Sequence, residues 1–348
     1  MKILSDLSLE QLTESVLSLG EPKFRAKQVF RAVHAGKTLE EMTDLKIGLR
    51  EKLKEIYCDK PCEIIKDLKS KDGTVKFLFR LYDGNVIEGV LMKYKYGYTQ
   101  CVSTQVGCRM GCAFCASTLE GLVRNLSAGE ILSQILEVNR RMGGIPGKRA
   151  VTNVVLMGSG EPLDNYDNVI DFLKLVSSPD GINISPRNIS LSTCGIVPKM
   201  YLLSESGLTV NLTVSLHSPF DEKRKKIMPI ANAYTVNEII EACKNYFYKT
   251  GRRIYFEYSL IKGENDTEEC AEKLIELLKG FPCHVNLIRL NAVKERNLLS
   301  SSDKSAETFL KRLEEGGLSV TIRRQMGADI DGACGQLRRK YINGGNSD

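Results

Sequence analysis

The sequence has only three histidines, His34, His217 and His284, which argues against a mechanism built on several imidazole groups. It has no apolar run as long as a membrane span, and its first residues lack the layout of a signal peptide. Its eleven cysteines, an odd number spread over 348 residues, argue against a disulfide framework. We therefore expect a cytoplasmic protein with no membrane partner, whose cysteines serve as metal ligands, reactive thiols or small buried side chains.

The overall composition is that of a soluble globular protein, with 42% hydrophobic and 26% charged residues. The length allows one large α/β domain with a small accessory domain. The net charge of +6 is compatible with a nucleic-acid partner but does not require one, because dedicated nucleic-acid-binding domains are usually more basic.

Residues 8–57 are predicted to form short helices. Ser8 with Gln11 and Thr38 with Glu41 fit the capping-box pattern, in which a hydroxyl and a carboxylate or amide satisfy the first backbone N–H groups of a helix. This segment therefore reads as a small helical accessory domain.

From Thr74 onward the apolar pattern changes to a period of two, which is typical of strands. Residues 74–81 and 86–93 are predicted to pair as a β-hairpin, because the Asp83-Gly84-Asn85 segment between them is a turn sequence. A third extended segment, residues 96–103, leads into a loop rich in cysteine.

After this loop, helical and extended segments alternate. Ser127 with Glu130 predicts a helix that runs to about Met142, and another helix is predicted near residues 169–176. The predicted strands cover residues 151–157, 188–192, 210–215, 253–258, 285–290 and 320–323. Repeated β–α units imply a parallel sheet with right-handed crossovers, either doubly wound or curved into a barrel, and six or seven strands favour a partial barrel.

The cysteine-rich loop has the spacing C-x3-C-x2-C at Cys108, Cys112 and Cys115. Structural zinc sites and ordinary ferredoxin clusters take four protein ligands, one more than this loop offers. Three thiolates in a short loop can hold three corners of a 4Fe–4S cluster and leave the fourth iron open to a reactive molecule. The alternative is a zinc knuckle with Cys101 as the fourth ligand, although zinc sites usually pair their ligands in C-x2–4-C units.

Polar and small residues follow several of the predicted strands. In parallel α/β folds the chemistry takes place beyond the carboxyl ends of the strands, so these residues are candidates for one site. Gly158-Ser-Gly160 lacks the third glycine of a dinucleotide-binding loop, and Glu161 beside it suits a cationic amine; a plain β–α turn is the alternative. The other strand-end groups are Ser192-Thr193-Cys194, Ser215-Leu216-His217, Asn291 and Asp329–Gly335.

Basic residues occur in three further segments. Residues 92–98 alternate lysines with tyrosines, and on a strand Lys93 and Lys95 would share one face with the rings on the other, which suits single-stranded RNA or an ordinary half-buried strand. The runs 223–226 and 338–340 are predicted to be solvated charge, the second of them close to Cys334 in sequence.

These motifs together resemble the radical S-adenosylmethionine (SAM) superfamily and, more specifically, the bacterial 23S rRNA (adenine-C2)-methyltransferases, dual-specificity enzymes that also act on tRNA. In that superfamily the open iron of a three-cysteine cluster chelates the amino and carboxylate groups of SAM. The resemblance covers nearly the whole chain, and the stretch around Cys334 is distinctive of this methyltransferase group. The stretches that carry it are Gln105–Cys115, Met157–Leu163, Val214–Ser218 and Ile330–Leu337.

The resemblance implies a radical SAM partial (β/α)6 barrel with a small helical N-terminal accessory domain and a linking β-hairpin, and it assigns roles to matching residues. Three of them are cluster ligands, namely Cys108, Cys112 and Cys115. The residues implied to contact SAM are Gly160, Glu161, Ser192, Ser215, Leu216, His217 and Asn291. Cys334 is implied to carry the methyl group, with Cys101 as its redox partner and Glu88 as the proposed proton acceptor.

This scheme suits its target, because carbon 2 of adenine is electron-poor and does not attack SAM as a nucleophile. By resemblance, one SAM methylates the Cys334 thiolate, and a deoxyadenosyl radical from a second SAM removes hydrogen from the S-methyl group. The methylene radical then adds to adenine, and a transient disulfide between Cys101 and Cys334 releases the product. A reductant must then reset the thiols.

The implied substrates are adenosine 2503 of 23S rRNA, before the ribosome is fully assembled, and adenosine 37 of tRNA. The implied electron donor is a flavodoxin or ferredoxin system, and the chain is expected to act as a monomer. The expected domains are residues 1–72 (helical, RNA-engaging), 73–97 (hairpin linker), 98–333 (barrel) and 334–348 (C-terminal segment with Cys334).

Two alternatives stay open. A related group methylates carbon 8 of the same adenine and shares the cysteines; there alanine tends to follow the Gly-Glu element, whereas this chain has Pro162, which favours the carbon-2 enzyme. A non-catalytic RNA-binding protein with a zinc site at Cys101, Cys108, Cys112 and Cys115 is an alternative of a different class, but it leaves Cys334 and the strand-end motifs unexplained.

Overall fold

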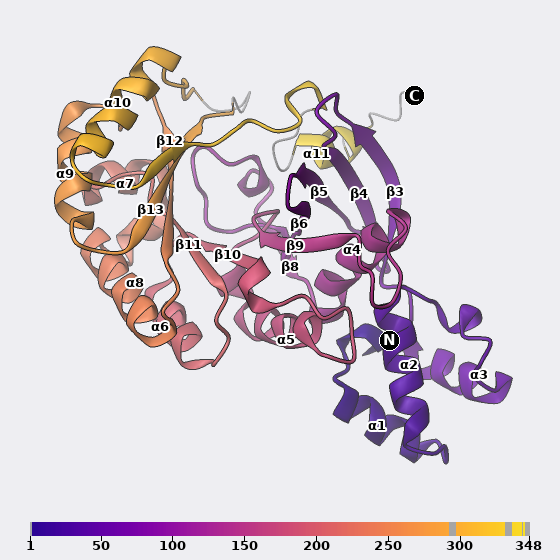
Figure 1. Cartoon of the computed structure of the whole chain (residues 1–348). Helices are drawn as coiled ribbons and strands as arrows, with labels where there is room; N and C mark the ends of the chain where they lie inside the picture. Colours follow the sequence, from indigo (N-terminus) through magenta and orange to yellow (C-terminus); the bar gives the residue numbers. More distant parts are fainter. Residues whose placement is uncertain (1, 292–296, 331–335, 343, 345–348) are drawn as a thin grey trace.

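The computed structural model describes residues 2–291, 297–330, 336–342 and 344. Its central feature is a single ten-stranded sheet with the strand order β14-β13-β12-β11-β10-β9-β6-β5-β4-β3 (Figure 1). In that order the strands are β14 (Val320–Ile322), β13 (Cys283–Arg289), β12 (Ile254–Leu260), β11 (Asn211–Ser215), β10 (Ile189–Thr193), β9 (Val151–Leu156), β6 (Gly97–Cys101), β5 (Val86–Tyr94), β4 (Val75–Leu81) and β3 (Cys62–Lys69).

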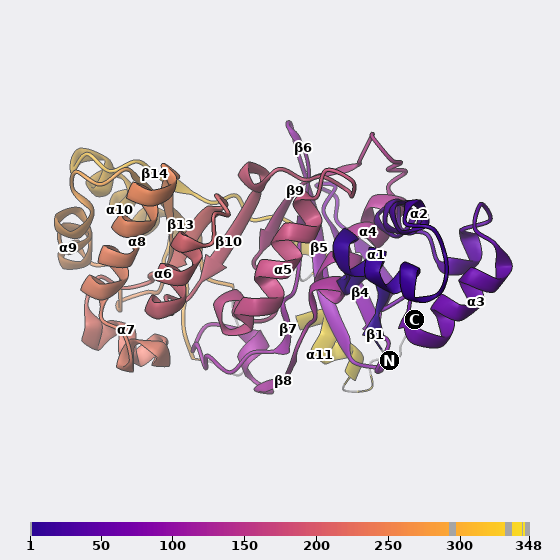
Figure 2. The same cartoon turned by 90° about the horizontal axis from the view of Figure 1, so that it is seen from below.

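The part of the sheet from β6 to β14 is parallel throughout and forms the predicted partial barrel. Strand β6 pairs with β5 and β9, not with β14, so the barrel stays open on one side. Helices alternate with these strands and lie along the outer side of the sheet (Figure 1). They are α4 (Ala128–Arg141), α5 (Tyr166–Ser177), α6 (Val197–Glu205), α8 (Val236–Thr250), α9 (Glu268–Leu278) and α10 (Asp303–Glu315). The short helix α7 (Asp221–Ile227) lies instead at the carboxyl ends of β10 and β11 (Figure 2).

The other part of the sheet, from β3 to β6, is antiparallel and extends the barrel sheet without a break. The predicted hairpin is present as β4 and β5, joined at the Asp83-Gly84-Asn85 turn, where the Asp83 carboxylate accepts a hydrogen bond from the backbone N–H of Asn85. Strand β3 was not predicted; it lies within residues 1–72, which we assigned to the accessory domain. The domain boundaries stay a prediction.

Residues 92–98 span the end of one predicted strand and the start of the next, so lysines and tyrosines do not alternate along a single strand. Strand β5 ends at Tyr94, and the chain turns back into β6 at Gly97, so that Tyr94 and Tyr96 stack with ring centroids 5.0 Å apart. The turn lies at the amino end of β6, whereas the cysteine loop follows its carboxyl end. Figure 2 shows the β5–β6 turn projecting on the side of the sheet opposite to β7 (Gln105–Gly107) and β8 (Leu122–Asn125).

The N-terminal helices are α1 (Leu9–Ser18), α2 (Phe24–His34) and α3 (Ile47–Ile56). Both predicted capping boxes are present, but the one at Thr38 begins only a three-residue 3-10 turn, Leu39–Glu41. This region joins the barrel through Asp6, which accepts a hydrogen bond from the backbone N–H of Gly129 at the start of α4, and through Arg31, which pairs with Asp180 at 2.8 Å. A short parallel pair, β1 (Lys2–Ile3) and β2 (Tyr57–Cys58), ties together the two ends of this region.

One apolar core runs through the barrel helices, the sheet and the N-terminal helices. The helix predicted from Ser127 is α4, whose capping box is complete. A last helix, α11 (Gln336–Ile342), contacts β5 (Figure 2). Within the described residues, no helix combines the length and the apolar character needed to cross a membrane.

Candidate active site

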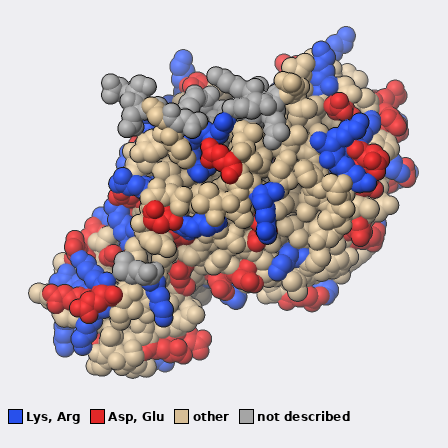
Figure 3. All heavy atoms as spheres, turned by 180° about the vertical axis from the view of Figure 1, so that it is seen from behind, with Lys and Arg blue, Asp and Glu red and all other residues tan. Residues whose placement is uncertain are grey.

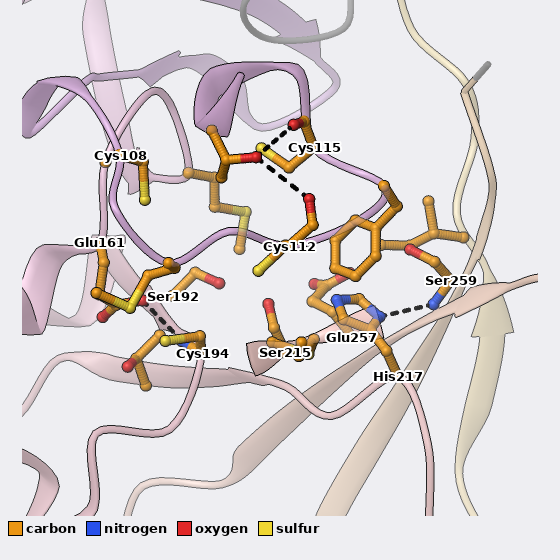
Figure 4. A pocket seen from close by; sticks show the side chains of 18 of the residues that line it. Cys108, Cys112, Cys115, Glu161, Ser192, Cys194, Ser215, His217, Glu257 and Ser259 are labelled. Carbon is orange, nitrogen blue, oxygen red and sulfur yellow. Dashed lines mark hydrogen bonds between the residues drawn. The ribbon is translucent and has the colours of Figure 1, made fainter. Parts of the chain in front are cut away.

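A cavity of about 270 Å³ opens at the carboxyl ends of the barrel strands, between these ends and the cysteine loop. Figure 4 shows Cys108, Cys112 and Cys115 on the loop side and Glu161, Ser192 and Ser215 on the strand side of the same space. The structure therefore gathers residues that lie more than one hundred positions apart in sequence. The residues that line the cavity include Cys108, Met110, Cys112, Phe114, Cys115, Met157, Gly160, Glu161, Ser192, Cys194, Ser215, His217, Glu257, Ser259 and Arg323.

The cysteine loop is held between the short strands β7 and β8. Gly107, just before Cys108, has φ = +79°, and a Cβ there would lie only 2.0 Å from the carbonyl oxygen of Gly121, so only glycine fits. At the other side of the loop the N–H of Ala113 donates to the carbonyl of Ile227 at 2.8 Å, and the Thr118 hydroxyl donates to the carbonyl of Cys115 at 2.9 Å. The loop backbone is thus fixed before any ligand binds.

The three loop cysteines all line the cavity and are the candidate ligands of a cluster. No three His, Cys, Asp or Glu side chains among the described residues are grouped closely enough to hold one metal ion. Cys101, the fourth ligand of the zinc alternative, packs instead with Val90 and Met92. Burial raises the pKa of the Cys108 thiol to about 12 and also raises that of Cys112, so metal binding must displace their protons.

Glu161 is fully buried on the opposite wall of the cavity. Its carboxylate accepts hydrogen bonds from the N–H of Cys194 at 2.7 Å and of Leu163 at 3.0 Å. Burial raises the pKa of this carboxyl, although these hydrogen bonds oppose the shift. Among the described residues no Lys, Arg or His forms an ion pair with it. The Glu161 carboxylate is therefore held in a fixed orientation by hydrogen bonds, but none of the described residues balances its charge.

Gly160 lets the Gly-Glu element approach the loop closely. Its φ is +109°, and a Cβ there would lie 2.7 Å from the Cβ of Gln105 and from the hydroxyl of Thr104. The side-chain oxygen of Gln105 accepts a hydrogen bond from the N–H of Glu161 at 2.9 Å. The Gly160-Glu161 segment is thus fixed against strand β7, which leads into the cysteine loop. It is not a turn that faces solvent.

His217 is buried beside the loop and has φ = +55°, which is unusual for a residue other than glycine. Its Nδ1 accepts a hydrogen bond from the N–H of Ser259 at 2.9 Å, and its ring meets that of Phe114 edge-on with centroids 4.5 Å apart. Burial lowers the pKa of His217 to about 3, so the imidazole is neutral at physiological pH. Ser192 and Ser215 also line the cavity, whereas the side chain of Leu216 lies in the apolar core.

Sequence reasoning missed two charged residues of the cavity. Glu257 on β12 pairs with Arg323, which follows β14, at 3.2 Å, and also accepts from Asn286 at 3.1 Å. The signal was present, because an acidic residue inside an otherwise apolar strand has to face a polar space. Cys194 was noted only as part of a strand-end motif, yet it lines the cavity and packs with Cys112.

Two predictions of solvated charge were wrong for one residue each. Arg224, in the middle of the run 223–226, is fully buried because it shares the inner face of α7 with Ile227. Arg338 of α11 is also buried, and its guanidinium donates to the carbonyl of Val86 at 2.7 Å and pairs with Glu120 at 2.8 Å.

The remaining predicted residues lie apart from the cavity or outside the described residues. Glu88 is buried on β5, where Lys76 lies 3.2 Å from one of its oxygens and the N–H of Arg338 donates to the other. Cys101 shares an apolar cluster with Met157, a residue that lines the cavity. Asn291 is exposed and accepts a hydrogen bond from Gln325 at 2.9 Å. Cys334 lies outside the described residues.

The face opposite to that of Figure 1 carries basic and acidic side chains interspersed with one another (Figure 3). The net charge of +6 is therefore not gathered into one basic region among the described residues of this face.

Comparison with known proteins matches two family models. The radical SAM superfamily model matches residues 102–278, and the model of the ribosomal RNA large subunit methyltransferase N-terminal domain matches residues 3–58. A probable dual-specificity RNA methyltransferase RlmN from Lachnoclostridium phytofermentans is 52% identical, with 96% of this chain and 94% of the relative covered. One from Clostridium perfringens is 53% identical, with 98% of each covered.

A solved structure gives the same result. The crystal structure of a radical SAM methyltransferase from Sphaerobacter thermophilus superposes with a TM-score of 0.92 at 40% sequence identity. The match covers 97% of this chain and 99% of that one, so it includes the N-terminal helices, both parts of the sheet and the cavity.

Proposed function

Because the chain belongs to the radical SAM superfamily and, within it, to the RlmN family of dual-specificity RNA methyltransferases, we propose that it methylates carbon 2 of adenine in two RNAs. The proposed targets are adenosine 2503 of 23S rRNA and adenosine 37 of tRNA. The observation that carries the proposal is the pairing of three loop cysteines with a buried carboxylate, Glu161, across one cavity.

The residues present fit the group that the family uses. Cys108, Cys112 and Cys115 would hold three corners of a 4Fe–4S cluster, and Glu161 would accept the ammonium group of SAM. When bound, the cluster supplies the electron that cleaves SAM reductively to methionine and a 5′-deoxyadenosyl radical. The protein contributes a loop with a fixed backbone, an oriented carboxylate and a cavity between the loop and the strand ends.

Three further residues are proposed to act on the RNA, of which Glu88 and Cys101 lie on strands β5 and β6 and Cys334 lies outside the described residues. Cys334 would accept the methyl group, Glu88 would take the proton from carbon 2, and Cys101 would release the product as a disulfide with Cys334. Strand pairing supports their proximity, since Cys101 on β6 lies opposite Val90 on β5, two residues from Glu88. Helix α11 begins two residues after Cys334, and the N–H of its Arg338 donates to Glu88.

The alternatives have less support. Pro162 after Glu161 favours carbon 2 over carbon 8, and it occupies the first position of a short 3-10 turn, where proline is well accommodated. A non-catalytic zinc protein is opposed by the family membership and by the packing of Cys101 in an apolar cluster that includes none of the loop cysteines.

The test is to locate the methyl group. The reconstituted protein is incubated with 23S rRNA, with tRNA, with SAM and with a flavodoxin or ferredoxin reducing system, and the RNA nucleosides are analysed by mass spectrometry. We expect 2-methyladenosine from both RNAs. Recovery of 8-methyladenosine would support the carbon-8 alternative, and methylation of rRNA alone would remove tRNA from the proposal.

A further inference from the structure

Arg224 is a fully buried arginine on the inner face of α7. Its Nε donates to the carbonyl of Leu216 at 3.0 Å, and its Nη2 donates to the carbonyls of Cys194 at 2.6 Å and Ser215 at 3.3 Å. These carbonyls belong to the ends of β10 and β11, and two of the three residues line the cavity. The guanidinium therefore lies directly behind the cavity wall.

Arg224 forms no ion pair with any carboxylate among the described residues. None of the ion pairs in that part of the chain includes it, and its Nη1 is buried without a hydrogen-bond acceptor. The carboxylate of Asp221, on the same helix, interacts with the guanidinium only beyond ion-pair distance and accepts a hydrogen bond from the N–H of Val236 at 2.7 Å. Burial accordingly lowers the pKa of the guanidinium. A buried charge without a partner is costly, so such a residue calls for an explanation.

The groups around Arg224 suggest what its charge is for. Cys112 and Cys194 both lie close enough to interact electrostatically with it. When three thiolates and a cluster are present, this side of the cavity becomes strongly anionic. A fixed cation behind the wall would then gain the partner that it lacks, without reorganisation of the strand ends.

We propose that Arg224 is a positioning residue that serves as the built-in counter-charge of the cluster, so that it both fixes the ends of β10 and β11 and raises the reduction potential of the cluster. The inference rests on the proposed function, because it needs a cluster at Cys108, Cys112 and Cys115. The physical reason is that reduction adds a negative charge, and a nearby cation stabilises the reduced form more than the oxidised form.

The first test compares reduction midpoints of the reconstituted protein, measured by a dye-mediated titration followed by electron paramagnetic resonance. Arg224→Gln removes the charge but keeps a polar end for the carbonyls, and Arg224→Lys keeps the charge. We expect Arg224→Gln to lower the equilibrium constant for reduction about tenfold, which is about 59 mV more negative for one electron. Arg224→Lys should stay close to the wild type.

A matched control is available in Arg253, whose Nε and Nη2 donate to the carbonyl of Cys283 at 3.0 and 2.6 Å. This arginine also binds strand backbone, but at the amino ends of β12 and β13, at the opposite edge of the sheet from the cavity. Arg253→Gln should leave the midpoint unchanged. A shift in Arg253→Gln as large as that in Arg224→Gln would mean that any loss of packing moves the potential, and would overturn the proposal.

The second test is independent of electron transfer and uses the melting temperature with and without cluster. Arg224→Gln should lower the melting temperature more in the cluster-loaded protein than in the cluster-free protein. Arg253→Gln should lower the melting temperature by the same amount in both forms. Equal losses for Arg224→Gln in the two forms would show that Arg224 only clamps the strand ends. Failure of cluster-free Arg224→Gln to fold, under conditions where the cluster-free wild type folds, would lead to the same conclusion.

Iron and sulfide analysis of the wild type separates a failure of the proposed function from a failure of the role proposed for Arg224. If the wild-type protein binds no iron and sulfide, the proposed function fails before any variant is compared. If it binds the cluster and the midpoints of wild type, Arg224→Lys and Arg224→Gln coincide, only the role of Arg224 is wrong.

Discussion

In the antiparallel half of the sheet, β3 to β6, buried charges face each other: the Lys76 ammonium lies 3.2 Å from the Glu88 carboxylate. In the parallel half, β9 to β14, Glu161 and Arg224 are buried to a similar degree, yet each has only neutral partners among the described residues. Both halves belong to one continuous sheet and share its strand geometry. The difference therefore concerns how buried charge is balanced.

This contrast separates buried charge that is balanced within the protein from buried charge that a ligand can balance. A matched pair such as Lys76 and Glu88 is complete in the free protein, and it links β4, β5 and α11. The charges of an unpaired carboxylate and an unpaired guanidinium at one cavity are balanced only when groups of the opposite sign bind there. SAM offers an ammonium group to Glu161, and a cluster offers negative charge to Arg224. The parallel half is thus pre-organised for cofactors, which lower the cost of its buried charges on binding.

The largest expected effect is loss of the cluster. Alanine at Cys108, Cys112 or Cys115 should reduce bound iron and acid-labile sulfide from about four each per chain to none, because three ligands are the minimum for this open arrangement. Iron and sulfide analysis of anaerobically purified protein measures this. Cys194→Ala is the matched control, since Cys194 lines the same cavity from the strand side and should not be needed for iron binding. Stoichiometric zinc without sulfide in the wild type would refute the cluster.

The next effect concerns the matched pair. Lys76→Met leaves the buried Glu88 without its cation and should lower the free energy of unfolding by about 3–5 kcal/mol. Urea unfolding of the cluster-free protein, compared with the wild type, measures the loss. The double variant Lys76→Met with Glu88→Leu should recover a large part of it, because no unpaired charge is left. If the single and the double variant have the same free energy of unfolding, the loss comes from altered packing around Lys76 and not from an unbalanced charge.

Much of the fold could be predicted from sequence because its signals are local. The strands of the parallel half were each placed to within about three residues, since short apolar runs alternate there with capped helices such as that at Ser127. Strand β3 was missed, because its residues 62–69 mix acidic, basic and apolar side chains without a clean period of two. Its position is set by pairing with β4, which is a long-range effect.

The site was also predictable where residues stand next to each other in sequence. The spacing of three cysteines and the Gly160-Glu161 element both led to the cavity. Arg224 was misjudged because a run of four basic residues hides which one faces inward, and only the helix of α7 decides this. Glu257 carried a local signal, as an acidic residue inside an apolar strand, but its pairing with Arg323 joins β12 to the segment after β14 and had no local signal.

A smaller effect is expected at the unmatched carboxylate. Glu161→Gln should weaken SAM binding by about 1–3 kcal/mol, the range for a charge-assisted hydrogen bond, and leave bound iron unchanged. Calorimetric titration with SAM measures it. Burial raises the pKa of Glu161 above its unfolded value near 4.5, so its contribution to stability is present below that pH and is lost as pH rises toward the folded pKa. The cluster-free Gln variant should therefore be at least as stable as the wild type at pH 7, unlike Lys76→Met.

The smallest effect is expected at the second carboxylate of the cavity, Glu257. It tests whether the contribution of a carboxylate to SAM affinity depends on its being unpaired or only on its position in the cavity. Glu257 lines the same cavity as Glu161, but Arg323 already lies 3.2 Å from it. Its charge is thus balanced in the free protein, and Glu257→Gln should change SAM affinity by less than about threefold, well under the loss at Glu161. The same calorimetric titration, run beside that of Glu161→Gln, makes the comparison direct. Equal losses for the two variants would mean that every carboxylate of the cavity contributes to SAM binding, and the distinction between matched and unmatched charge would not hold there.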